Sequence, residues 1–429
     1  MIENSNQSTL KRLGDNFVSL VVLQGINYLV PLIIFPYLVR VLGIDGFGLY
    51  SFILAIIMYG VMLSDYGFDL SATRLISLHS HNKTKTDEIF STVMIIKFGI
   101  ALLYLMFLTV LILLVDKLAQ NASLYYIAYG LVIGQVLFPV WFFQGIEKMR
   151  YITILNALAK IIFTVLILIY VHTPDDLYLV LLFNALGAVI AGIIALYVAV
   201  KNFNISFYLP TYSQIRFYLK DGWYIFTSRI AVELYVTANV IILGFFASNA
   251  IVGYYSIVEK IVRAVGSLLE PLTRTVFPYL AKVYEESSEL FFKRNKQLFF
   301  LILSIMLPVA LVVFFNASWI LGIVSGDTPT PLMITMLQIF SFILVFFLYG
   351  HQFTNMLVTL GETKLLNNIV MIAGLINIIA APIVIYLFGV VGLVYLNVVI
   401  ALFIAVTKGY YIFYHKSLKS KTVDLPKEK

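Results

Sequence analysis

The chain has 429 residues, of which 61% are hydrophobic and 12% are charged, and its mean hydropathy is +0.96. A soluble domain of this length does not have so apolar a composition, which indicates an integral membrane protein. The net charge of +7 therefore indicates anchoring at an anionic membrane face rather than nucleic-acid binding, and the absence of Cys excludes disulfides, thiolate metal sites and Cys nucleophiles.

The hydropathy pattern predicts twelve transmembrane segments of roughly 20 residues, the length that crosses a bilayer core of about 30 Å. We expect an all-α integral membrane protein with two six-helix lobes. In chain order, the predicted segments are near residues 16–39, 47–66, 89–115, 123–144, 152–171, 178–200, 219–246, 251–280, 297–324, 332–358, 365–388 and 391–414.

The loops indicate the orientation of the chain in the membrane. Nearly all Lys and Arg residues outside the segments fall on one side, and the opposite loops carry only Arg40 and Lys117. This asymmetry places both termini in the cytoplasm. The expected parts are a cytoplasmic N-terminus (1–15), an N-lobe (16–200), a cytoplasmic linker (201–218), a C-lobe (219–414) and a basic cytoplasmic tail (415–429).

A short internal repeat relates the two predicted lobes. In each lobe a Leu-Gly pair precedes an outer turn and a Gly-x-Tyr-Ser motif follows it. Six segments separate the copies, so an axis along the membrane normal would relate the lobes and the transport path would lie between them. The alternative is chance similarity between hydrophobic segments, because the match is short. The two copies are Leu42-Gly43 with Gly48-Leu49-Tyr50-Ser51, and Leu243-Gly244 with Gly253-Tyr254-Tyr255-Ser256.

Charged residues lie inside the seventh and eighth segments, where hydrocarbon would penalise them unless they faced protein or water. A rise of about 1.5 Å per residue places Glu233, Lys260 and Arg263 near the midplane of the bilayer. Arg229 and Glu233 are at i and i+4, as are Glu259 and Arg263, so each pair can partly neutralise itself. Two alternatives stay open: ion pairs that only let the helices tolerate charge, or a polar cavity that contacts a substrate.

Several basic residues inside the segments have no acidic residue nearby in the sequence. Lys97 and Lys160 lie about 12 to 14 Å inside the third and fifth segments. Excess positive charge at depth favours an anionic substrate, although long Lys stems can instead snorkel to the cytoplasmic face. The basic residues inside segments are Lys97, Lys160, Arg229, Lys260, Arg263, Arg274 and Lys408. The candidate substrate-binding residues are Arg229, Lys260, Arg263, Glu233, Lys97, Lys160 and Arg40.

Other polar residues inside the segments have weaker signals. Asp65, Asp69 and Glu259 are candidates to bind a coupling ion, H⁺ or Na⁺, although acids at an interface are often simply solvated. The Asn residues inside segments, Asn239, Asn377 and Asn397 among them, fit interhelical hydrogen bonds better than ligand contacts. No P-loop and no metal-ligand cluster occur, so we expect no cofactor, no catalytic residue and no ATP hydrolysis. Movement of a substrate would be downhill or ion-coupled.

The order and spacing of several motifs over essentially the whole chain resemble the Wzx-type polysaccharide flippases of the multidrug/oligosaccharidyl-lipid/polysaccharide exporter superfamily. The resemblance implies translocation of an undecaprenyl-diphosphate-linked O-antigen repeat unit from the cytoplasmic to the periplasmic leaflet, by lobes that alternate access around a cationic cavity. Candidate protein partners are then an O-antigen polymerase and a chain-length regulator. The motifs are Phe35-Pro36-Tyr37-Leu38-Val39-Arg40-Val41-Leu42-Gly43 with Phe47-Gly48-Leu49-Tyr50, Asp65-Tyr66-Gly67-Phe68, Phe143-Gln144-Gly145-x-Glu147-Lys148-Met149, and Leu243-Gly244 with Val252-Gly253-Tyr254-Tyr255.

Two rival functions share some of these features. An ion-coupled multidrug exporter of the same superfamily would have the same fold, but its cavity should be acidic because most such substrates are cations. A polytopic glycan polymerase would need a sizeable outer loop to organise donor and acceptor, and the predicted outer connections are all short. The sequence therefore favours a flippase over both rivals, and leaves the sugar composition, the coupling ion and the oligomeric state open.

Overall fold

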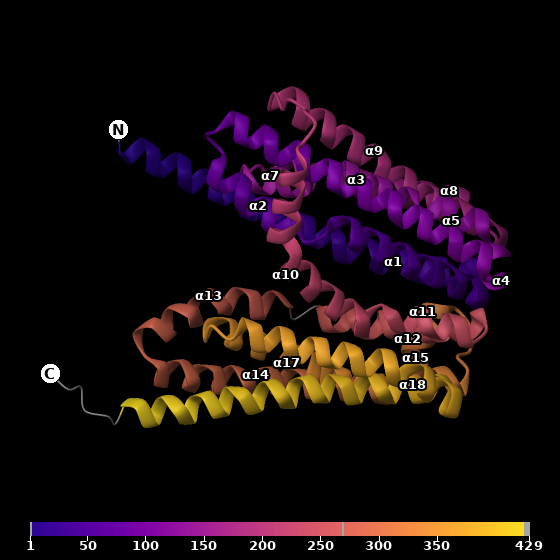
Figure 1. Ribbon diagram of the computed structural model, residues 1–429. Coiled ribbons are helices and arrows are strands. Elements are labelled where there is room, and N and C mark those ends of the chain that lie inside the picture. The colour runs from indigo at the N-terminus through magenta and orange to yellow at the C-terminus, as the bar shows by residue number, and fades with distance from the viewer. Residues whose placement is uncertain (1, 268–269, 424–429) are drawn as a thin grey trace. The chain divides into compact units, whose positions relative to one another are not determined.

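The computed structural model describes the backbone of residues 2–267 and 270–423, and the side chains of residues 33–267, 276–346 and 349–413. Within these ranges the regular secondary structure is helical, with no strand (Figure 1). The all-α prediction is confirmed for this part of the chain. The side chains of the N-terminus (1–15), of Arg274 and of the basic tail (415–429) lie outside the described residues.

The chain forms two compact units, Met1–Ile230 and Ala231–Lys429. The first unit consists of α1 (Ile2–Asp65), α2 (Phe68–His79), α3 (Lys83–Leu114), α4 (Asp116–Ala119), α5 (Ala122–Ala128), α6 (Gly130–Leu137), α7 (Val140–Gly145), α8 (Met149–Tyr170), the short η1 (Pro174–Asp176), α9 (Leu177–Asn202) and the start of α10 (Tyr212–Val236). The second contains the end of α10, then α11 (Ala238–Phe246), α12 (Asn249–Ser267), α13 (Glu270–Glu286), α14 (Ser288–Phe315), α15 (Ala317–Ser325), α16 (Pro331–Ser341), α17 (Ile343–Thr359) and α18 (Thr363–Val423).

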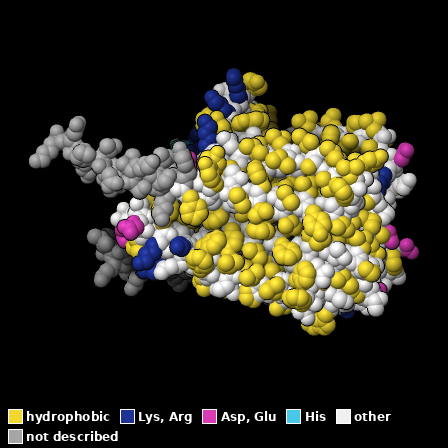
Figure 2. Space-filling view, turned by 90° about the horizontal axis from the view of Figure 1, so that it is seen from below, with side chains coloured by type: hydrophobic (Ala, Val, Ile, Leu, Met, Phe, Trp, Pro, Cys, Tyr) yellow, Lys and Arg dark blue, Asp and Glu magenta, His cyan; other side chains and the backbone are white. Residues whose placement is uncertain are grey.

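Many of these helices have the length and composition of membrane spans. Among the described residues, eight helical stretches are long and apolar enough to cross a membrane, and the bent pair α10 and α11, which meet at 44°, adds a ninth if it is one span. Large hydrophobic side chains are exposed along α3 and α14, as lipid contact requires, and Figure 2 shows a face whose middle is covered by hydrophobic side chains. The count of twelve segments in two six-helix lobes stays a prediction.

Two pairs of predicted segments are each joined at a single non-helical glycine. The first two lie in α1, which is non-helical at Gly43 (φ 68°, ψ 174°), and the last two lie in α18, which is non-helical at Gly389 (φ 65°, ψ −157°). No atom lies within 4 Å of the Cβ that either glycine would gain, so the positive φ rather than crowding favours glycine there. Gly244, the repeat counterpart of Gly43, lies inside α11, and that helix ends at an extended Ala247. The two copies of the repeat therefore differ in backbone at the shared glycine.

The core of the first unit is aromatic and lies where α2, α3 and α7 meet. Trp141, Phe142 and Phe143 of α7 are buried there with Phe90 of α3. Farther along, α6 packs closely on α9, and a Cβ on Gly134 would stand 2.5 Å from the Ala188 Cβ. Small residues at such a contact let two helix backbones approach, which is how helices associate where lipid removes the hydrophobic driving force.

The connection between α9 and α10 is tied to α3 rather than running free. The Asp87 carboxylate accepts a hydrogen bond from the Ser206 backbone nitrogen at 3.1 Å, and the Ser91 hydroxyl accepts one from the Tyr208 nitrogen at 3.3 Å. The predicted linker (201–218) and the following residues up to Ile230 thus belong to the first unit. The two compact units divide inside α10, and the predicted lobes (16–200 and 219–414) with the linker between them stay predictions.

Candidate functional site

A left-handed break between α1 and α2 positions the first group of predicted site residues. α1 ends at Asp65, and the next two residues, Tyr66 (φ 48°) and Gly67 (φ 75°), lead into α2. A Cβ on Gly67 would stand 2.7 Å from the Ile225 Cγ2 atom, so only glycine lets α10 come this close. The Tyr66 ring stacks on Phe226 of α10, with ring centroids 4.3 Å apart. The break between α1 and α2 therefore packs directly against α10, and each holds the other in position.

Four predicted site residues form one ion-pair network at this break. The Lys97 Nζ atom lies 3.0 Å from Asp65 Oδ1, and Arg229 Nη1 lies 3.3 Å from Asp65 Oδ2. Arg229 also pairs with Asp69 through its Nη2 atom. The Lys97 side chain is 1% exposed and that of Asp65 is 13% exposed. Two cations and two acids meet, so this four-charge network (Asp65, Asp69, Lys97, Arg229) has no formal excess charge.

The network corrects the expectation of uncompensated positive charge around Lys97. Its acidic partner lies 32 residues earlier in the chain, on α1, which packs against α3. For Arg229, the ion pairs in the described structure are with Asp65 and Asp69 rather than the predicted pairing with Glu233. The Oδ1 atom of Asp69 is buried and has no hydrogen-bond partner among the described residues. Among the carboxylate oxygens of the network, it is the one without a hydrogen-bond partner in the described structure.

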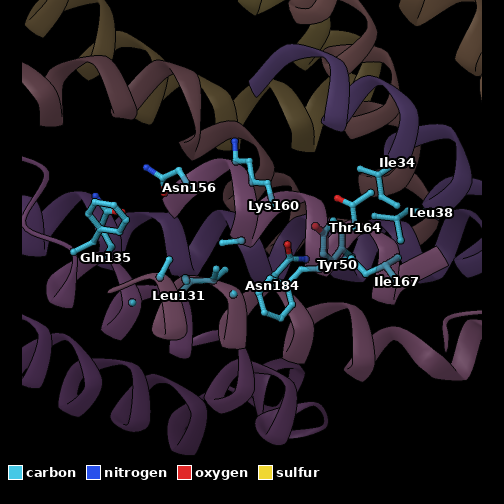
Figure 3. Close-up of a pocket in the computed structure, with 17 residues that line it drawn as sticks. Ile34, Leu38, Tyr50, Leu131, Gln135, Asn156, Lys160, Thr164, Ile167 and Asn184 are labelled. Atoms are coloured by element: carbon cyan, nitrogen blue, oxygen red, sulfur yellow. The ribbon is translucent and has the colours of Figure 1, made fainter. Parts of the chain in front are cut away.

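A polar cavity of about 310 Å³ lies inside the first unit, between α1, α6, α8 and α9. In Figure 3 the Gln135 side chain lies toward one end of it, Tyr50 and Thr164 toward the other, and Lys160 between them. Amide, hydroxyl and ammonium groups in an otherwise apolar wall are the usual means by which a ligand site fixes the orientation of a polar ligand. The polar lining residues are Tyr50, Gln135, Asn156, Lys160, Thr164 and Asn184.

The second unit contains the predicted pair Glu259 and Arg263 on α12. The Arg263 Nη2 and Nε atoms lie 2.7 and 3.2 Å from Glu259 Oε1, so the pairing expected from the i, i+4 spacing is confirmed. Arg263 Nη2 also donates to the Val236 carbonyl at 3.2 Å. Both charged residues line a cavity of about 140 Å³. Within the unit, the Arg263 side chain is 49% exposed and that of Glu259 is 14% exposed, so the guanidinium is the more accessible partner.

A chain of side-chain amides adjoins this pair. Asn377 Nδ2 donates to Asn239 Oδ1 at 2.8 Å, Asn239 Nδ2 donates to Asn397 Oδ1 at 2.7 Å, and Asn397 Nδ2 donates to the Tyr255 hydroxyl at 3.2 Å. These residues come from α11, α12 and both halves of α18. The prediction that these Asn residues join helices is confirmed, and Asn397 in addition lines the Arg263 cavity.

The remaining predicted residues are Lys260, Arg40 and Glu233, and the charges of Lys260 and Glu233 interact with that of Arg263. Lys260 is exposed on α12, Arg40 is exposed on α1, and Glu233 accepts a hydrogen bond from the Thr237 hydroxyl. Lys408 is one of the basic residues inside the predicted segments and is buried on α18, but it was not among the candidate binding residues. The signal that selected Lys97, a basic residue in an apolar segment without a nearby acid, would have selected Lys408 as well.

No group of three or more His, Asp or Glu side chains suited to hold a metal ion occurs among the residues that the structure describes. The chemistry of the described polar groups is therefore that of ion pairs, amides and hydroxyls. Such groups can bind and orient a ligand.

Sequence comparison identifies relatives over much of the chain. The family described as polysaccharide biosynthesis protein matches residues 13–284. A protein of Escherichia coli (strain K12) named "Putative O-antigen transporter" is 35% identical over 278 residues, which cover 65% of this chain and 66% of that protein. A protein of the same name from Shigella dysenteriae is 32% identical over 284 residues, covering 64% and 69%. The alignments thus span about two thirds of the relatives' own length.

Solved structures share the fold at low sequence identity. The lipid II flippase MurJ in an inward closed conformation has a TM-score of 0.71 at 13% identity, covering 91% of this chain and 87% of that one. An inward-facing multidrug resistance MATE family transporter of the MOP superfamily has a TM-score of 0.62 at 15% identity, covering 91% and 99%. These likenesses place the helical arrangement among transporter folds. The family match, which spans more than half of the chain, and the named relatives confirm the resemblance found in the sequence: the chain belongs to the polysaccharide biosynthesis protein family.

Proposed function

We propose that this protein is a flippase that moves undecaprenyl-diphosphate-linked O-antigen repeat units from the cytoplasmic to the periplasmic leaflet of the bacterial inner membrane. The family and the named transporters among its relatives support the substrate class. A diphosphate that bears sugars cannot cross hydrocarbon unaided, because its charge and hydroxyl groups would lose their hydration. The protein has to supply polar groups along the path, while the polyprenyl tail stays in the lipid.

The observation that carries the proposal is the polar cavity of about 310 Å³ inside the first unit. Gln135, Asn156 and Asn184 offer amide donors and acceptors, which match sugar hydroxyls, and Lys160 offers a cation, which matches a phosphate. In the second unit Arg263 presents a half-exposed guanidinium at a second cavity. Cationic and amide groups together suit an anionic saccharide better than a hydrophobic cation.

Ion coupling by H⁺ or Na⁺ is part of the proposal, and Asp69 is the acid that the geometry supports best for it. Its Oδ1 atom is buried without a hydrogen-bond partner in the described structure, while its Oδ2 atom pairs with Arg229. A proton or a cation at Oδ1 would weaken the pull of Asp69 on Arg229, so ion binding and the ion-pair network would influence each other. Asp65 and Glu259 remain further candidates for coupling.

The rival proposal is an ion-coupled drug exporter, because MATE transporters share this fold. The two functions differ in the charge of the substrate that the cavities should accept. The ion pairs found at Lys97 and Arg263 lower the excess of cations expected from the sequence, which leaves this rival open to experiment. Export of cationic dyes by the purified protein, without movement of lipid-linked sugars, would favour the exporter.

Reconstitution tests the proposed function directly. Purified protein in liposomes should move a defined undecaprenyl-diphosphate-linked oligosaccharide between leaflets, and an inward H⁺ or Na⁺ gradient should change the rate if transport is coupled. In cells, a deletion strain should accumulate lipid-linked single repeat units that face the cytoplasm. Single repeat units attached to lipid A on the periplasmic side would instead indicate loss of a polymerase and contradict the proposal.

A further inference from the structure

Lys408 is a buried basic residue that lies outside the groups described so far as ion pairs. It lies on α18 and is 5% exposed. Its Nζ atom lies 2.8 Å from the Thr354 hydroxyl oxygen and 3.4 Å from the Gly350 carbonyl oxygen, both on α17. These contacts hold the ammonium group in place, but both acceptors are neutral, and neither compensates the charge.

The ammonium faces a cavity of about 180 Å³ inside the second unit. His351 and Thr354 line this cavity together with Lys408, and no Asp or Glu is among its lining residues. The cavity adjoins the one that contains Arg263, because Tyr235, Val236 and Ala401 line both. Two adjoining cavities in one unit thus each contain a basic side chain.

A buried ammonium without a counter-charge is costly, and an anionic ligand relieves that cost. Lysine binds phosphate as a point charge. The Thr354 hydroxyl donates to the Gly350 carbonyl at 2.7 Å and accepts a hydrogen bond from the Lys408 ammonium, so it positions the ammonium. We propose that Lys408, Thr354 and His351 form an anion subsite for one phosphate group of a diphosphate, whose other phosphate extends toward Arg263 in the adjoining cavity. This inference rests on the proposed function for its ligand, and it adds a binding residue that the sequence analysis did not select.

Binding of inorganic pyrophosphate to the purified full chain in detergent tests the subsite. We expect the protein to bind pyrophosphate more tightly than inorganic phosphate, and Lys408→Gln to weaken pyrophosphate binding about tenfold, the loss typical of one charge-assisted hydrogen bond. The matched control is Lys201→Gln, because Lys201 also donates to a hydroxyl, that of Tyr197 at 2.7 Å, but is exposed. Affinity in Lys408→Gln equal to that of the control would overturn the subsite.

A second variant keeps the test decisive if Lys408→Gln does not fold, as judged by its elution and thermal unfolding. Thr354→Val removes the hydroxyl at nearly constant volume and leaves the charge of Lys408 in place. We expect it to weaken pyrophosphate binding about threefold, and unchanged binding in a folded Thr354→Val protein would overturn the proposed geometry. Lys408→Arg, which keeps the charge, should retain part of the affinity.

Further measurements distinguish failure of the anion subsite from failure of the proposed flippase function, and they identify the source of the anion. Flipping of a lipid-linked oligosaccharide by the wild type, with Lys408→Gln binding pyrophosphate normally, would overturn the subsite alone. Absence of flipping, with weakened binding in Lys408→Gln, would overturn the function and retain an anion site. Undecaprenyl diphosphate that displaces pyrophosphate from the wild type supports a lipid headgroup as the ligand, and failure to displace it limits the site to free anions.

Discussion

The two units differ in the partners of their basic side chains. In the first unit, Lys97 and Arg229 are joined to acids on other helices, so the four-charge network connects α1, α2, α3 and α10. In the second unit, Arg263 pairs with Glu259 on its own helix, and Lys408 has neutral partners. Ion pairs between helices build structure, whereas a pair within one helix leaves its cation accessible. Whether the acidic partner lies on another helix or on the same helix therefore distinguishes a structural basic residue from one that is available to a ligand.

The largest expected effect comes from removing the shared acid of the network. Asp65→Ala leaves Lys97 buried without its counter-charge, which should lower the free energy of unfolding by about 3–5 kcal/mol. Thermal unfolding in detergent and the protein level in the membrane would report this loss. The double variant Asp65→Leu, Lys97→Met should recover much of the stability, because an apolar pair of similar volume replaces the ions. A double variant as unstable as the single one would contradict a structural role for the pair.

The second largest loss of stability is expected at Gly67, the glycine between α1 and α2. Gly67→Ala adds a Cβ about 2.7 Å from the Ile225 Cγ2 atom at a position with φ 75°, so crowding and backbone strain combine. We expect a loss of about 2–4 kcal/mol in the free energy of unfolding. Gly361→Ala is the matched control, because Gly361 has φ 82° and no atom within 4 Å of its Cβ position, which leaves a strain of about 1 kcal/mol. Equal losses in the two variants would show that the close approach of α10 does not matter.

Breaking the chain of side-chain amides in the second unit should cause an intermediate loss of stability. Asn239→Leu removes the hydrogen bonds with Asn377 and Asn397. Losing these two bonds between membrane helices should lower the free energy of unfolding by about 1–2 kcal/mol in total. Asn316→Ala serves as control, because the Asn316 amide donates only to its own helix, at the Val312 carbonyl, and is exposed. Thermal unfolding of the two purified variants compares them, and a difference near zero would mean that the chain does not hold the helices together.

Arg263 should show the smallest change in stability and a clear change in transport. Arg263→Ala removes the pair with Glu259 within α12 and the hydrogen bond to the Val236 carbonyl of α10, together worth about 1 kcal/mol. We nevertheless expect O-antigen surface display to fall about tenfold at normal protein level. Arg263→Lys should retain part of the display, and Lys260→Ala should reduce it as well. Arg294→Ala, an exposed residue bonded to Gln297, should leave display unchanged. Normal display in both the Arg263→Ala and Lys260→Ala variants would exclude these residues from the path.

The sequence predicted what depends on local order in the chain. Apolar runs of about 20 residues identified the helices, and the i, i+4 spacing identified the pair of Glu259 and Arg263, because helix geometry alone brings such residues together. The prediction of two segments on either side of Gly43, and of two on either side of Gly389, agrees with the non-helical backbone at these residues. The pattern did not show that one glycine with positive φ is enough to join each pair.

Contacts between distant helices were beyond a prediction from one sequence. The partner of Lys97 comes from α1, and no periodicity in α3 indicates which helix will lie beside it. Because its acidic partner lies far away in the sequence, Lys97 was predicted to be an unpaired cation that binds a substrate. Lys408 had the same local pattern, and its hydrogen-bond partners among the described residues are neutral. A basic residue in an apolar segment without a nearby acid is therefore a candidate, but the pattern does not tell whether the fold will neutralise it.

The connection between α9 and α10 has a consequence for how the polypeptide can be divided. Its Ser206 and Tyr208 amides are fastened to side chains of α3, and the Tyr218 hydroxyl donates to Glu88 a short distance farther on. A protease cut or a genetic break between residues 206 and 208 would therefore leave both new ends bonded to the same helix. Two fragments co-expressed on either side of this point should migrate together as one particle.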